Sequence, residues 1–234
     1  MSQLGIVGRR GFPHLPQLHR EQLAALNGTR DSNRDSLMYK FRPDATIEQL
    51  QVLPFQIHEA PCYIPEKSQL FSVEWGAPGG RNSEHDYQYL LDLKTSNLTT
   101  IRTNPPTRNL HGCVYCKGRL HVVADGGPHE TEYLATIDPA TWERTTILNN
   151  LEEQPFISLN DLDMDREGNY YMTNSLSGWG QYLHPCGAPT APTVYFVNTT
   201  TMRIKTLLYL QNGNTSGVAV SADGGLLGTG RPVE

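Results

Sequence analysis

Short runs of apolar and β-branched residues alternate with polar turns over most of the chain. In four places a polar turn directly precedes such a run, as expected where a strand follows a tight hairpin turn. The turns are residues 66–69, 117–119, 166–169 and 221–225, and the first three are about 50 residues apart. A period of this length is typical of repeated supersecondary units. The pattern therefore predicts one hairpin in each repeat.

A second pair of β-rich runs lies between these hairpins. The runs are YQYLLDLKTSNLTTI from Tyr87, EYLATIDPATWERTTIL from Glu132 and TVYFVNTTTMRIKTLL from Thr193. Two hairpins per repeat make a four-stranded antiparallel unit, and radial repetition of such units is how a β-propeller avoids exposed sheet edges. A sandwich of short strands is the alternative, but it does not need the longer period. We expect an all-β fold of the β-propeller class.

The N-terminal part of the chain does not follow this repeat. Residues 1–45 are polar, rich in Arg and prone to turns, with one short helix predicted across Pro16–Leu26. No Gly/Ser-rich or Pro-rich linker divides the remainder. We therefore expect an N-terminal extension over residues 1–45 and one partial propeller domain over residues 46–234.

Charge and hydropathy exclude some classes of partner. The formal net charge is -5, and the basic residues form no long cluster, so a nucleic-acid partner is not expected. No stretch has the 18 or more consecutive apolar residues of a membrane-spanning helix, and the start of the chain lacks a secretory apolar segment. These features predict a cytoplasmic protein as the chain is written, or a secreted one if the true N-terminus differs.

Two cysteines, Cys113 and Cys116, have the spacing of a redox or zinc half-site. No second Cys pair and no His pair at zinc spacing accompanies them. The segment around them resembles a strand, in which residues three apart point to opposite faces. We favour the structural interpretation over a metal site.

Three polar stretches lie a few residues before hairpin turns, at residues 57–61, 158–161 and 214–217. Because they have the same position in each repeat, we expect them at one end of the propeller channel. Carboxylate and amide oxygens that converge there suit Ca²⁺, which takes 6 to 8 oxygen ligands. His58 either orients a carboxylate ligand or packs in the core.

The segments HEAPCYIPEKSQLFSV, SLNDLDMDREGNYYMTN and TSGVAVSADGG occur in this order at the repeat spacing. Together they resemble the gluconolactonase, senescence marker protein and luciferin-regenerating enzyme family, in its fungal lactonase-like branch. The resemblance covers about residues 50–227. It implies a six-bladed propeller with a divalent cation, Ca²⁺ or a similar ion, in its channel.

The resemblance also implies hydrolysis of small lactones or esters. Glu59 matches the family's Glu ligand and Asn160 its first Asn ligand. Asp161 matches an acidic neighbour that supports the metal or the substrate, and we take it as the candidate catalytic residue. In such a site the metal would polarise the carbonyl while a carboxylate activates water or attacks directly.

The sequence departs from the family pattern in three places. Ser216 occupies the position of the second Asn ligand, and a hydroxyl binds Ca²⁺ more weakly than an amide carbonyl. Residues 172–174 read Met-Thr-Asn where the family has Phe-Thr-Asp. The chain ends at Glu234, so that about three and a half to four blades fit and the blade with the family's further Asp is missing. We therefore expect a product truncated at its C-terminus.

Two functions remain open from the sequence. The first is a metal-dependent hydrolase of a small lactone or ester in fungal metabolite metabolism. The second is a degenerate or truncated propeller that binds a small molecule or a protein. A protein-interaction propeller is disfavoured because no Trp-Asp or Gly-His blade signature recurs. An incomplete propeller would also leave an open sheet edge, which predicts self-association.

Overall fold

The computed structural model describes part of the chain. This part consists of residues 59–74, 87–124, 126, 130–156, 159–175, 193–209, 217–221 and 227–229. Every regular element within it is a β-strand, except one 3₁₀ turn at Pro65–Lys67. This part of the chain contains no helix long and apolar enough to cross a membrane. The predicted extension, residues 1–45, lies outside the described residues, so the domain boundary stays a prediction.

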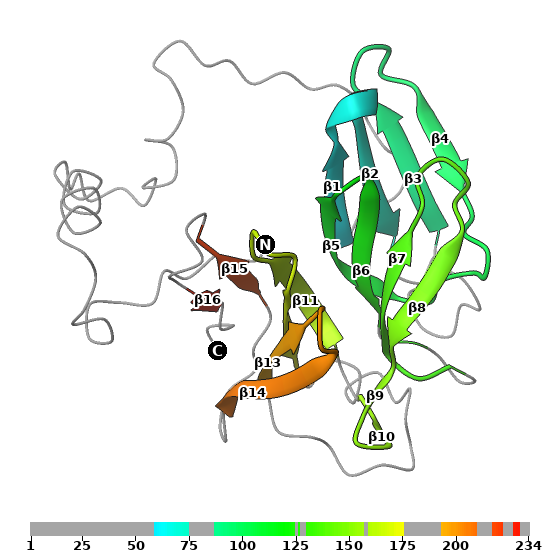
Figure 1. Cartoon of the computed structure of the whole chain (residues 1–234). Helices are drawn as coiled ribbons and strands as arrows, with labels where there is room; N and C mark the ends of the chain where they lie inside the picture. The colour runs from blue at the N-terminus through cyan, green and yellow to red at the C-terminus, as the bar shows by residue number, and fades with distance from the viewer. Residues whose placement is uncertain are drawn as a thin grey trace, which may run out of the picture. The chain divides into compact units, whose positions relative to one another are not determined.

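Three four-stranded antiparallel sheets dominate the structure (Figure 1). The first contains β1 (Glu59–Ile64), β2 (Gln69–Glu74), β3 (Tyr87–Asp92) and β4 (Leu98–Ile101). The second contains β5 (Leu110–Cys116), β6 (Arg119–Ala124), β7 (Tyr133–Ile137) and β8 (Arg144–Leu148). The third contains β11 (Leu159–Met164), β12 (Tyr170–Asn174), β13 (Thr193–Asn198) and β14 (Arg203–Tyr209). The described residues also form two two-stranded hairpins: β9 (Asn150–Leu151) with β10 (Gln154–Pro155), and β15 (Val218–Val220) with β16 (Leu227–Thr229).

The strands of each sheet follow one another in chain order, each paired with the next. The predicted all-β class and the predicted four-stranded antiparallel repeat are therefore confirmed. Both cysteines of the Cys-x-x-Cys pair lie in one strand, β5, as expected. The number of blades in the complete repeat stays a prediction.

The second sheet is apolar on both faces, because its alternate side chains enter two different cores. On β6, Leu120 and Val122 pack in a core with residues of the first sheet such as Phe71. Val123, on the opposite face, packs with residues of the third sheet such as Met172. The period-2 pattern of the sequence thus places one hydrophobic layer on each side of the second sheet.

The first strands of the sheets adjoin one another. β1 contacts β5, β5 contacts β11, and β11 contacts β15. These strands correspond to the innermost strands of propeller blades. Residues at the start of each first strand are therefore brought together, although they are far apart in the sequence.

One polar interaction links the second and third sheets within their shared core. His121 Nε2 lies 3.2 Å from the carbonyl oxygen of Cys116, and Nδ1 lies 2.8 Å from Tyr170 Oη. A carbonyl oxygen only accepts hydrogen bonds, so Nε2 carries the proton and Tyr170 donates to Nδ1. Burial lowers the pKa of His121, which agrees with this neutral tautomer.

Removing the Tyr170 hydroxyl is expected to destabilise the protein. Tyr170→Phe leaves the buried Nδ1 of His121 without its donor, which costs about 1–2 kcal/mol of unfolding free energy. Urea unfolding at pH 8 measures the effect. Tyr171→Phe is the matched control, because the neighbouring Tyr171 is half-buried and its ring contacts Phe196. Equal unfolding free energies for the two variants would contradict the assignment.

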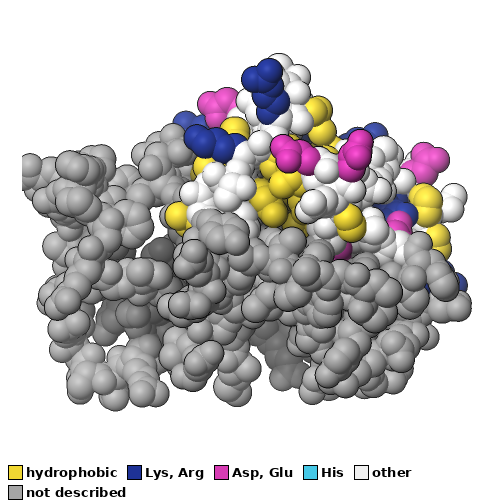
Figure 2. All heavy atoms as spheres, turned by 90° about the horizontal axis from the view of Figure 1, so that it is seen from below, with side chains coloured by type: hydrophobic (Ala, Val, Ile, Leu, Met, Phe, Trp, Pro, Cys, Tyr) yellow, Lys and Arg dark blue, Asp and Glu magenta, His cyan; other side chains and the backbone are white. Residues whose placement is uncertain are grey.

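The described residues on one face of the molecule carry charges of both signs (Figure 2). On the face shown in Figure 2, acidic and basic side chains are interspersed with hydrophobic ones. This agrees with the sequence, in which no extended basic cluster occurs.

Candidate functional site

The first strands of the three sheets share one irregularity. The pairing with the second strand shifts between Glu59 and Cys62 in β1, between Leu110 and Cys113 in β5, and between Leu159 and Asp161 in β11. Such β-bulges insert unpaired residues and re-aim side chains, often beside functional sites. The bulges thus occur at the same point of each repeat.

The polar side chains at these bulges converge. His111, which follows Leu110 in the β5 bulge, has its Nδ1 3.7 Å from Glu59 Oε1 and 3.5 Å from Asn160 Nδ2. The side chain of His111 is only 4% exposed, whereas that of Glu59 is 30% exposed. One imidazole therefore lies next to the predicted ligands Glu59 and Asn160, and the Glu59 carboxylate is reachable from solvent.

A glycine permits this close approach of β5 and β11. A Cβ atom on Gly112 would lie 2.8 Å from the Asp161 Cα atom, from Asp161 Oδ1 and from the Leu162 backbone nitrogen. These distances are shorter than any ordinary contact of a side chain with backbone. Gly112 is thus the residue that lets His111 lie beside Asn160.

The Asp161 carboxylate connects β11 to β15. Its Oδ2 accepts a hydrogen bond of 3.0 Å from the Val218 backbone N–H, and its Oδ1 accepts one of 2.9 Å from the Leu162 N–H. Two residues on, Asp163 Oδ2 accepts a hydrogen bond of 2.6 Å from the Val220 N–H. Alternate acidic side chains of β11 therefore bind alternate backbone N–H groups of β15.

Asp161 is partly buried, and the desolvation of its carboxylate raises its pKa from 3.8 to about 6. The hydrogen bonds from the Val218 and Leu162 backbone act in the opposite direction, and the nearby charges of Asp163 and Glu59 add to the rise. Both carboxylate oxygens are engaged with backbone N–H groups. The structure thus shows a role for Asp161 in holding β15, while its catalytic role stays a prediction.

Two thiols lie on the adjacent strands β1 and β5. Cys113 packs against the core that contains Cys62, and neither forms a disulfide. Burial raises the pKa of Cys113 well above its ordinary value, and a hydrogen bond with Cys62 adds to the rise. A thiol held protonated in this way is a poor metal ligand and a poor nucleophile. The Cys62–Cys113 contact is thus part of the packing between the first two sheets.

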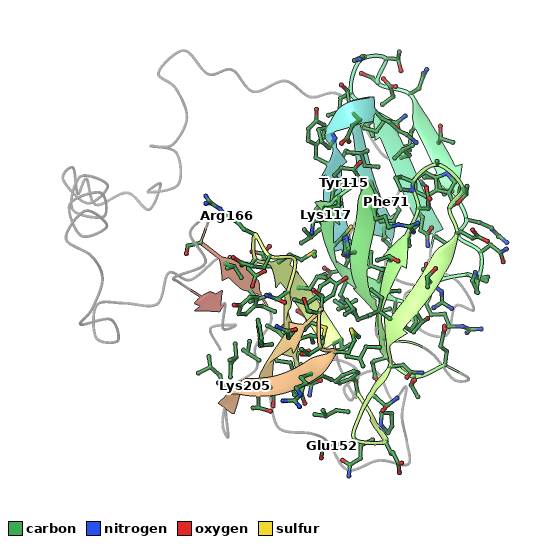
Figure 3. The ribbon with its side chains drawn as sticks, in the orientation of Figure 1. Phe71, Tyr115, Lys117, Glu152, Arg166 and Lys205 are labelled. Carbon is green, nitrogen blue, oxygen red and sulfur yellow. The ribbon has the colours of Figure 1, made fainter. Side chains whose placement is uncertain are left out.

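The site occupies the start of the first strands, away from their hairpin turns. Figure 3 labels Tyr115 and Lys117 near the hairpin end of β5, whereas His111 lies at the opposite end of that strand. Of the predicted site residues, Glu59, Asn160 and Asp161 are described and lie on β1 and β11. Ser216 lies outside the described residues.

Sequence reasoning missed His111. The stretch around it contains an amide, Asn109, but no carboxylate like those of residues 57–61 and 158–161. Its position at the start of the second repeat's first strand is the signal that could have found it. His58, the predicted orienting histidine, lies outside the described residues.

The donors suit a hard cation in part. Glu59 and Asn160 offer carboxylate and amide oxygens, which Ca²⁺ prefers, whereas the imidazole of His111 is not a ligand typical of Ca²⁺. The described residues contain no group of three or more His, Cys, Asp and Glu side chains with metal-binding geometry. Because only Glu59 and Asn160 among these side chains offer suitable oxygens, they are the residues that would hold a Ca²⁺ ion, with His111 beside them.

The chain is similar in sequence to two lactonohydrolases of Aspergillus oryzae. It is 28% identical to lactonohydrolase oryH over 99 residues, 40% of this chain and 20% of that protein. It is 26% identical to lactonohydrolase oryL over 142 residues, 57% of this chain and 30% of that protein. These matches thus span less than a third of each relative's length. No family model matches the chain.

Solved structures share the fold at low identity. A candidate gluconolactonase superposes with a TM-score of 0.58 at 15% identity, over 81% of this chain and 76% of that one. A gluconolactonase of Xanthomonas campestris gives 0.57 at 15% identity, over 74% and 53%. TolB of Acinetobacter baumannii gives 0.52 at 16% identity, over 77% and 39%. The predicted β-propeller fold is confirmed. The chain is thus similar to gluconolactonases in fold and, over part of its length, to fungal lactonohydrolases in sequence.

Proposed function

We propose that the protein hydrolyses a small lactone or ester at the candidate site, with a Ca²⁺ ion held by Glu59 and Asn160. The observation that carries this proposal is the convergence of these two side chains, from β1 and β11, on His111 Nδ1. The lactonohydrolases among the relatives support the substrate class. We place the substrate among small fungal metabolites for the same reason.

The protein's own residues would hold the cation and keep the strands around it in place. A bound divalent cation supplies Lewis-acid polarisation of a carbonyl oxygen. Glu59 and Asn160 would hold that cation at the start of the first strands, and the 30% exposure of Glu59 leaves a path for a small substrate. Asp161 would keep β15 against β11 through its bond to Val218, which maintains the wall of the site.

The alternative, a binding module without catalysis, is favoured by one observation. Both oxygens of Asp161 accept backbone hydrogen bonds, from Leu162 and Val218, so each has only one lone pair left for water or substrate. This alternative predicts that cation and ligand bind without turnover.

Calcium is expected to stabilise the wild-type protein through Glu59. At a hundredfold excess over the dissociation constant, binding adds about 2.7 kcal/mol to the free energy of unfolding. Glu59→Gln removes the carboxylate ligand, so the rise of the melting temperature with CaCl₂ should disappear. Differential scanning fluorimetry in CaCl₂ and in EDTA measures it. Glu66→Gln is the matched control, since Glu66 is exposed in the 3₁₀ turn that follows β1 and its substitution should leave the rise unchanged.

A measurement of turnover distinguishes the hydrolase from the binding module. Hydrolysis of a panel of five- and six-membered lactones and simple aryl esters is followed in a pH-stat, with CaCl₂ and with EDTA. Calcium-dependent hydrolysis that is lost in Glu59→Gln supports the proposal. Calcium binding without hydrolysis of any panel member supports the binding module, and the absence of a calcium-dependent melting shift contradicts the cation site.

A further inference from the structure

We infer that His111 is a positioning residue for Asn160: its Nδ1 accepts a hydrogen bond from the Asn160 amide and so directs the Asn160 carbonyl oxygen toward the cation site. This inference rests on the proposed function, because it concerns a ligand of the proposed Ca²⁺ ion. It assigns a role to a residue that the sequence motifs do not include.

The distances favour this arrangement over a bond between His111 and Glu59. His111 Nδ1 is 3.5 Å from Asn160 Nδ2, a long hydrogen bond, and 3.7 Å from Glu59 Oε1, beyond hydrogen-bond range. An Nδ1 atom that accepts from Asn160 has no proton of its own. In this tautomer the imidazole acts on the Asn160 amide.

The surroundings keep the imidazole in one place. The His111 side chain is 4% exposed and lies in the β5 bulge, directly before the close contact of Gly112 with β11. A buried, packed ring has few alternative orientations. His111 can thus impose its own orientation on Asn160, which is partly exposed.

An amide ligand needs such a partner because its two ends have opposite chemistry. Only the Oδ1 atom of Asn160 can bind a cation, and an unrestrained amide also presents its NH₂ group. A hydrogen bond to Nδ2 excludes the second orientation. Partners that orient ligands in this way typically contribute 10–100-fold to metal affinity.

The test compares two substitutions of nearly equal shape. His111→Leu removes the acceptor, and we expect the Ca²⁺ dissociation constant to rise about tenfold. His111→Asn places a carbonyl oxygen the same number of bonds from the backbone as Nδ1, so it should stay within about threefold of wild type. Isothermal titration calorimetry with CaCl₂ on the full chain measures both, and near-UV circular dichroism checks the folding. If the Leu variant does not fold, His111→Gln replaces it. The acceptor of Gln lies one bond further from the backbone, so we expect the same loss of Ca²⁺ affinity.

A second experiment replaces the amide ligand, Asn160, by a carboxylate. In an Asn160→Asp background either carboxylate oxygen can face the cation, so orientation no longer matters. His111→Leu should then change the Ca²⁺ affinity by less than about threefold. A loss of about tenfold in both backgrounds would overturn the inference, because it would show an effect independent of the amide.

The outcomes distinguish the inference from the proposed function. Equal affinities of the Leu and Asn variants would overturn the role of His111, while loss of binding in Glu59→Gln would still support the cation site. Absence of Ca²⁺ binding to the wild-type protein would overturn the proposed cation and this inference with it.

Discussion

Alanine at position 112 is expected to lower the free energy of unfolding by about 3 kcal/mol, at the upper end of the usual cost of overpacking. The new Cβ atom would lie 2.8 Å from Asp161 Cα and from the Leu162 nitrogen, which are backbone atoms and cannot move aside alone. β5 and β11 must separate, so His111 would also leave Asn160. For a chain of this size the melting temperature should fall by roughly 6–12 °C. Thermal unfolding followed by circular dichroism measures the change.

Gly118→Ala is the matched control for this experiment, because Gly118 lies in the hairpin turn that follows the same strand. A Cβ atom there would meet nothing within 4 Å, and only the positive φ of 78° opposes it. The strain costs about 1 kcal/mol. A Gly112→Ala protein as stable as Gly118→Ala would contradict the close packing of β5 on β11.

Asp161→Asn is expected to change the dependence of stability on pH. Burial raises the pKa of Asp161 to about 6 in the folded protein, against 3.8 ordinarily. A raised pKa contributes stability that is complete below pH 3.8 and is lost as the pH rises through 6. Relative to the asparagine variant, which does not titrate, the wild type should therefore lose about 2 kcal/mol of unfolding free energy between pH 4 and pH 7. Urea unfolding in EDTA measures the difference without cation binding.

Asp92→Asn is the control for the direction in which stability changes with pH. The pKa of the exposed Asp92 is lowered, chiefly by hydrogen bonds from the Thr95 and Lys94 backbone N–H groups. A lowered pKa contributes stability above pH 3.8 that is lost on further acidification, the reverse of Asp161.

The Asp161 prediction is contradicted if the difference in unfolding free energy between the wild type and Asp161→Asn is the same from pH 4 to pH 7. The Asp161 carboxyl group would then not be desolvated as described.

The strands and their pairing could be predicted well from local pattern. The runs beginning at Tyr87, Glu132 and Thr193 each form two adjacent antiparallel strands, as their alternation and polar turns indicate. Alternation within a strand depends only on nearby residues. The shifts of register between Glu59 and Cys62 and at the two equivalent points had no such local signal.

The candidate site could be predicted in part. Glu59 and Asn160 were found because they precede hairpins at the same point of the repeat, and the structure brings both to one imidazole. His111 could not be found in this way, because its stretch has no polar motif like theirs. The burial of Asp161 also depends on Gly112 and Val218, which lie on other strands.

The sequence by itself determined the repeating antiparallel hairpins and the all-β class, since both depend on residues close together in the chain; Glu59 and Asn160 stay proposed ligands. Only the tertiary structure decided which residues meet between sheets. His111 and Asn160 are 49 positions apart, and Asp161 and Val218 are 57 apart. Such contacts, and the pKa shift that burial causes, exist only after the first strands have packed against one another.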